Sequence, residues 1–110
     1  MKKYLYITLL IVPSLNHAEL LFPENGQELN YIYVLFDWNQ EPNSEFYNIQ
    51  ISNSESFDDI ILDTHEETTL YIEKDTLVWE NIYYWRVRPI YSDDSWWERA
   101  PGRIGGFEIR

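Results

Sequence analysis

The chain has 110 residues, a length that allows one domain. It carries 19 acidic and 8 basic side chains, a formal net charge of −11, so its surface repels phosphate backbones and we expect no nucleic acid among its partners. It contains no cysteine, which excludes disulfides, thiolate metal sites and the lipid-bearing cysteine of bacterial lipoproteins.

Residues 1–18 have the pattern of a cleavable secretion signal. Two lysines near the start precede the apolar run 4–12, and Ala18 is a suitable last residue before cleavage. The run is shorter than the roughly 20 apolar residues that cross a bilayer. An uncleaved N-terminal anchor and an ordinary strand are the alternatives. We expect an exported protein, extracellular, on the cell surface or periplasmic, whose domain spans 19–110 and makes no membrane contact beyond the signal peptide.

Alternation of apolar and polar residues is the main structural pattern after residue 18. It indicates strands, because successive side chains of a strand point to opposite faces. In chain order, the expected strands are 20–22, 31–38, 46–52, 60–63, 68–73, 82–91 and a last strand with Phe107 and Ile109. About seven short strands separated by turn residues predict an all-β fold, a seven-stranded antiparallel immunoglobulin-like β-sandwich.

The same alternation assigns a buried face to each longer strand. The expected inward side chains are Ile32, Val34, Phe36, Trp38, Tyr47, Ile49, Ile51, Leu70, Ile72, Tyr83, Trp85, Val87 and Pro89. Since no disulfide is available, these side chains have to supply the stability, and the large aromatic ones contribute most.

Short runs in several of these strands resemble one known family. Phe36-Asp37-Trp38 resembles the second strand of fibronectin type III domains, whose tryptophan lies at the centre of the sandwich. Tyr47-Asn48-Ile49 resembles their third strand, and Leu77 with Tyr83 resembles the leucine and tyrosine-corner pair before their sixth. The block 83–89 is similar to bacterial extracellular members. These motifs occur in the order and spacing typical of the family, and the resemblance extends over the whole of 19–110.

The resemblance implies a fold and a role as a spacer or binding module. It implies no activity, because the function of a widely used fold depends on the sites that it carries. In the family, the hydroxyl of the tyrosine that matches Tyr83 bonds to nearby backbone. The stretch 95–106, with Trp96-Trp97 and Gly105-Gly106, departs from the family pattern.

The residues after 18 form no recognisable catalytic group. Their one histidine, His65, lies in an expected loop at 65–67, and no serine has the context of an activated nucleophile. We therefore expect a solvated His65, no enzyme activity and no cofactor.

Clustered aspartates offer a second kind of chemistry, since calcium favours groups of oxygen ligands. The two clusters are Asp58, Asp59 and Asp63, and Asp93 with Asp94. Neither has the spaced ligands and glycine of a dedicated calcium loop, so we expect weak ion binding at most and no structural metal.

An exposed aromatic patch is the first candidate interaction site. With Trp38 inward, the alternation turns Tyr31, Tyr33 and Leu35 outward, and we expect Tyr71 of the adjoining strand to face the same way. Contiguous apolar patches mark interfaces, so this one is a candidate for docking onto a neighbouring domain or another protein. The alternative is that loops or the first strand cover it.

The outer face of the opposite sheet has a different composition. Alternation places Asn48 and Gln50 beside Arg86 and Arg88 on this face. Cross-strand charge pairs are common in sheets, so we expect the two arginines to pair with Glu108 and other acids.

Adjacent tryptophans form the second candidate site. Trp96 and Trp97, with Arg99 nearby, suit stacking on sugar rings and hydrogen bonding to hydroxyl groups. The alternative is that one of the two tryptophans closes the sandwich, as one aromatic residue does in the family.

Two functional hypotheses follow. The first is a non-catalytic exported interaction or spacer module, the N-terminal domain of a larger secreted or cell-surface protein. The second is a carbohydrate-binding accessory module of a polysaccharide-active enzyme whose catalytic domain lies downstream. They differ in whether polysaccharide is a partner, and the exposure of Trp96 and Trp97 discriminates between them.

Overall fold

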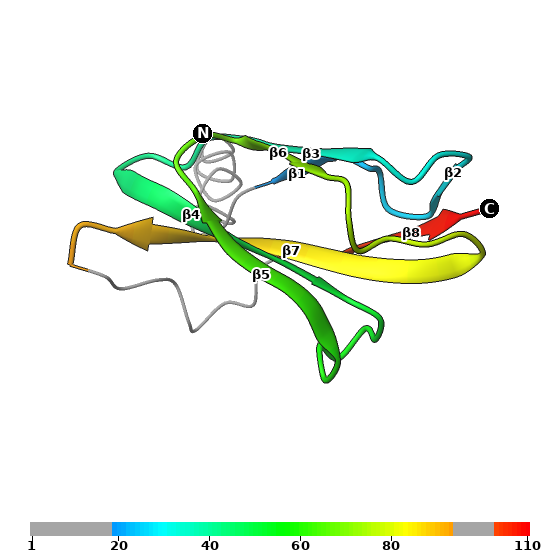
Figure 1. The fold of residues 1–110 in the computed structure, drawn as a ribbon. Coiled ribbons are helices and arrows are strands. Elements are labelled where there is room, and N and C mark those ends of the chain that lie inside the picture. The colour runs from blue at the N-terminus through cyan, green and yellow to red at the C-terminus, as the bar shows by residue number, and fades with distance from the viewer. Residues whose placement is uncertain (1–18, 94–102) are drawn as a thin grey trace, which may run out of the picture.

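The computed structural model describes residues 19–93 and 103–110, which form two β-sheets packed face to face (Figure 1). The strands are β1 (Leu20–Phe22), β2 (Gln27–Leu29), β3 (Val34–Trp38), β4 (Ser44–Ser52), β5 (Ile60–Glu66), β6 (Leu70–Glu73), β7 (Asn81–Tyr91) and β8 (Gly105–Ile109). Across these described ranges, no helix is long and apolar enough to cross a membrane.

The two sheets differ in size and in strand direction. One has three strands in the order β1-β3-β6, and the other has five in the order β2-β8-β7-β4-β5. The β2–β8 pair is parallel and the other pairs are antiparallel. The expected all-β sandwich is therefore correct, whereas seven strands and strictly antiparallel pairing are not.

The additional strand arises where the chain changes sheets. After β1 the chain turns at 24–26, and the Gly26 N–H donates a 2.6 Å hydrogen bond to the carbonyl of Gly106. The next three residues, Gln27–Leu29, then pair with β8 of the larger sheet. This segment is too short and too polar for a clear alternation, so the sequence pattern did not predict it.

Most of the expected core is confirmed. The inward residues of β3, β4 and β7 are buried, and they form one cluster with residues of β8. Phe36 meets Trp85 edge-on with ring centroids 4.9 Å apart, and Trp38 meets Tyr47 at 5.8 Å. Burying a side chain of this kind stabilises the fold by about 1.5–3 kcal/mol, which is how a chain without disulfides holds together.

The tyrosine corner is also present. The Tyr83 hydroxyl accepts a 2.9 Å hydrogen bond from the Val78 N–H, and Leu77 is buried beside this turn. Gly105 lies next to the same core, where an added Cβ would come within 2.9 Å of Trp85 Nε1. A glycine is therefore required where the sequence departs from the family pattern.

Several expected boundaries were wrong. The strand β5 continues to Glu66, so His65 lies in a strand, with its ring centroid 5.0 Å from that of Phe46. The long antiparallel pairing with β4 extends β5 in this way, because Asn48 lies opposite His65 and Tyr47 opposite Glu66.

The facing of β6 was also wrong. Leu70 and Ile72, expected inward, are 47% and 54% exposed, whereas Tyr71 is half-buried and Glu73 is buried. The register with β3 is the reason, since it places Tyr71 opposite the inward Phe36. Alternate residues must then point outward.

Candidate interaction surfaces

The outer face of the three-stranded sheet is mostly apolar, with Asp37 of β3 on it opposite Leu70. Leu35 of β3 lies directly opposite Ile72 of β6, and Leu70 lies two residues before Ile72 on the same face. Leu21 of β1 is also exposed. We call Leu21, Leu35, Leu70 and Ile72 the outer apolar face; it includes only one of the four residues expected in the aromatic patch.

Tyr71 does not belong to any exposed patch. Its ring packs against Phe36 with centroids 6.4 Å apart, and its hydroxyl donates a 2.6 Å hydrogen bond to Glu73 Oε1. Burial and this bond to Glu73 raise the pKa of Tyr71. The residue supports the core, which corrects the expectation that it faces a partner.

Glu73 closes the turn that follows β6. Burial alone would raise the pKa of its carboxyl group, but the hydrogen bond from Tyr71 and those from the turn outweigh burial and lower it. Its Oε2 accepts bonds from the N–H groups of Asp75 and Thr76, at 2.9 and 2.8 Å, and from the Thr76 hydroxyl. A buried carboxylate that is bonded in this way is a structural group.

Tyr31 and Tyr33 lie at one end of the sandwich, beside a residue that the sequence analysis missed. They line an open hollow of about 230 Å³ together with Asn30, Ile32 and Trp79 of the β6–β7 loop. Tyr33 is 63% exposed and Trp79 is 50% exposed. The available signal was a tryptophan between the buried Leu77 and the start of β7 at Asn81, a place where no core position is expected.

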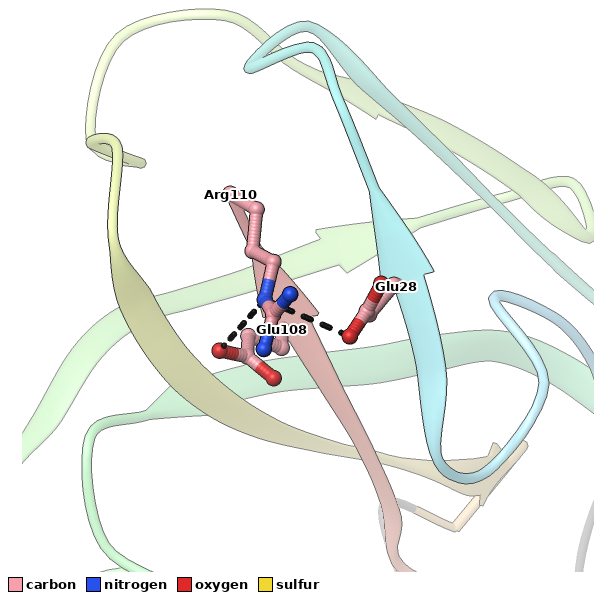
Figure 2. Close-up of polar contacts among 3 residues, drawn as sticks. All are labelled: Glu28, Glu108 and Arg110. Atoms are coloured by element: carbon pink, nitrogen blue, oxygen red, sulfur yellow. Dashed lines mark hydrogen bonds and ion pairs between the residues drawn. The ribbon is translucent and has the colours of Figure 1, made fainter.

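A second hollow adjoins the first and is more polar. It has a volume of about 350 Å³, and Gln27–Tyr31 and Arg110 line it. Arg110 Nε lies 3.2 Å from Oε2 of both Glu28 and Glu108, and Figure 2 shows the guanidinium between the two carboxylates. The hydrogen bond from Arg110 to Glu108 and the charge of Glu28 raise the pKa of the guanidinium. These groups are exposed, so their ion pairs add little to stability.

The outer face of the five-stranded sheet carries a polar ladder across β5, β4 and β7. Asp63 accepts hydrogen bonds from the side-chain amides of Asn48, at 2.6 Å, and Gln50, at 3.0 Å. Arg86 Nε donates to Gln50 Oε1 at 2.8 Å, and Arg88 donates to Asn48 Oδ1 at 3.1 Å. The expected placement of Asn48 and Gln50 beside Arg86 and Arg88 is confirmed.

The expected role of Glu108 toward these arginines was wrong. Glu108 lies opposite Ile82 in the β7–β8 register and pairs with Arg110, while Arg86 lies opposite Gln50. The guanidinium of Arg86 lies 4.0 Å from the ring centroid of Phe57. Burial and then the neighbouring charge of Arg88 lower the pKa of Arg86, with Asp63 acting in the opposite direction.

The described residues carry little information on the expected sugar and metal sites. Trp96, Trp97 and Arg99 lie outside the described residues, as does Asp94, so the sugar contact expected there stays a prediction. In the part of the chain that the structure describes, no three His, Asp or Glu side chains are grouped to hold a metal ion.

Comparison with known proteins supports the fold. The crystal structure of an Fn3-like protein from Clostridium thermocellum superposes with a TM-score of 0.59 at 13% sequence identity, covering 86% of this chain and 90% of that one. No protein-family model and no curated protein matches the sequence. The chain therefore has an Fn3-like β-sandwich fold, shown by structure rather than by sequence identity.

Proposed function

We propose that the chain is a non-catalytic interaction or spacer module of an exported protein, and that its outer apolar face docks onto a neighbouring domain or another protein. The observation that carries the proposal is the exposure of Leu35, Leu70 and Ile72 together on adjacent strands. Single exposed apolar residues are normal on a protein surface, but a contiguous group marks an interface. The Fn3-like fold is consistent with a generic module.

The composition of the rest of the chain supports the same conclusion. A formal charge of −11 favours solubility by repulsion, so a mostly apolar face is an exception to the general surface character, although Asp37 lies on it opposite Leu70. A neighbouring domain or partner that covers this face would remove apolar area from water, at about 25 cal/mol per Å².

Site-specific photocrosslinking tests the docking face. A benzoylphenylalanine placed at Ile72, in the protein expressed from its own gene, should crosslink to one defined partner or to a neighbouring domain. The same probe at Ile60, an exposed isoleucine of β5, is the matched control and should not. Equal crosslinking from both positions, or none from Ile72, contradicts the proposal.

Export is tested separately. Residues 1–18 fused to an alkaline phosphatase that lacks its own leader should direct the enzyme out of the cytoplasm, where it becomes active. Retention of inactive enzyme in the cytoplasm would refute the secretion signal without affecting the docking face.

A further inference from the structure

Three exposed rings surround the apolar hollow at the end of the sandwich. Tyr31 and Tyr33 come from the segment between β2 and β3, and Trp79 comes from the loop before β7; these segments meet at the end where the C-terminus lies (Figure 1). The three side chains are 40%, 63% and 50% exposed. Large aromatic side chains are usually found inside, so three around one hollow call for an explanation.

The loop that carries Trp79 is fixed on both sides of the ring. The Val78 N–H is bonded to the Tyr83 hydroxyl at 2.9 Å, and the Asn81 side-chain amide donates a 2.7 Å hydrogen bond to the Trp79 carbonyl. Binding to a loop with a fixed backbone loses less conformational freedom than binding to a mobile loop. The backbone that carries Trp79 is therefore in place before a ligand arrives.

Hydrogen-bonding groups lie directly beside the rings. The polar hollow shares Asn30 and Tyr31 with the apolar one, so the two are neighbours. It offers the amide of Asn30, which both donates and accepts, the carboxylate of Glu28, which accepts, and the guanidinium of Arg110, which donates.

We propose that the two hollows together form a binding site for a neutral oligosaccharide. The apolar face of one sugar ring would stack on Trp79 and the tyrosines, and the hydroxyl groups of the next would bond to the polar hollow. Hydroxyl groups suit this part of the site because they donate and accept. Arg110 already faces two carboxylates, so the local charge disfavours an anionic sugar.

A proline-rich peptide is the main competing ligand, since aromatic-lined grooves also bind such segments. Proline has no N–H group, so it would leave the carboxylate of Glu28 without a donor from the ligand. The polar half of the site therefore favours the sugar. The inference does not depend on the outer apolar face, which is made of different residues.

Native gels cast with a neutral polysaccharide test the site. The four probes are hydroxyethylcellulose, xylan, mannan and soluble starch. We expect at least one to retard the full chain, and Trp79→Ala and Tyr33→Ser each to raise the apparent Kd at least tenfold. Both residues are at least half exposed, so the variants should melt near the wild type; if one does not fold, the other still decides.

Matched controls separate this site from general stickiness and from the docking face. Val78→Ala, beside Trp79 and similarly exposed, and Ile72→Ser, on the outer apolar face, should both bind like the wild type. Retardation by none of the four polysaccharides, or an unchanged Kd in the aromatic variants, overturns the proposal. Binding of decaproline or heparin that Trp79→Ala abolishes, in place of neutral polysaccharide, overturns the ligand class.

Discussion

The outer faces of the two sheets differ in which side chains are buried and which are exposed. On the five-stranded sheet, Asn48 is only 2% exposed although it faces outward, because its amide bonds to Asp63 and Arg88. On the three-stranded sheet, Leu35 and Ile72 face outward, and both are exposed.

The difference shows which face has its interactions satisfied within the domain. A polar group can be buried without loss when its hydrogen bonds are made, and the ladder makes them within the domain. An apolar side chain gains by leaving water, and the described strands give the outer apolar face nothing to pack against. The polar face is therefore satisfied within the domain, whereas the apolar face stays exposed in the described part of the chain, as the proposed docking requires.

Breaking the ladder should have the largest effect on stability. Asn48→Ala removes one hydrogen-bond partner of Asp63 and one of Arg88, so we expect a loss of about 2 kcal/mol in the free energy of unfolding, measured in urea. Asn53→Ala removes the exposed bond to Asp59 and is the control, with an expected loss of under about 0.5 kcal/mol. Similar losses in the two variants would mean that the ladder does not stabilise the fold.

Glu73 is the one charged residue on the inner side of the three-stranded sheet, and changing it should have an intermediate effect on stability. Glu73→Gln should cost about 1 kcal/mol at neutral pH, because the turn loses a charged acceptor. The folded pKa of Glu73 is lowered, so the wild-type advantage is present above the unfolded pKa and disappears as pH falls through the folded value. Unfolding free energies of both proteins from pH 7 to pH 3 measure this advantage. An advantage that stays constant down to pH 3 contradicts the assignment.

The smallest effect on stability should come from the outer apolar face. Leu70→Ser and Ile72→Ser change side chains that are about half exposed, so each should alter the free energy of unfolding by under about 0.5 kcal/mol. Chemical denaturation checks this, with the buried Val34→Ala as the contrasting variant, for which we expect a loss of about 2 kcal/mol. A loss from Ile72→Ser as large as that from Val34→Ala would place Ile72 in the core and remove the docking face.

The comparison also explains where sequence-based prediction succeeded. In β3, β4 and β7 one alternating set is clearly more apolar or aromatic than the other, so Phe36, Ile49 and Trp85 were predicted inward and are buried. In β6 the two alternating sets are Leu70 with Ile72 and Tyr71 with Glu73, and hydrophobicity favours the first as the inward set. The register with β3 instead places Tyr71 and Glu73 on the inner side.

The candidate sites were predictable only in part. Tyr31 and Tyr33 were predicted as exposed from their positions on either side of the inward Ile32, and they are exposed. Trp79 joins them in space from a loop 46 residues beyond Tyr33 in the printed sequence, a proximity that no local pattern encodes. Asn48, Gln50, Arg86 and Arg88 were placed correctly on one face, but the expected pairing of the arginines with Glu108 was wrong.

The sequence alone therefore determined the all-β class and the aromatic core, because each depends on residue type and short spacing, and the resemblance to fibronectin type III domains implied the tyrosine corner. The tertiary structure alone decided the parallel β2–β8 pair, the facing of β6 and the meeting of Trp79 with Tyr31 and Tyr33. Each of these depends on which strands lie side by side and in what register. A shift of one residue in register moves every side chain of a strand to the other face, so local alternation cannot settle it.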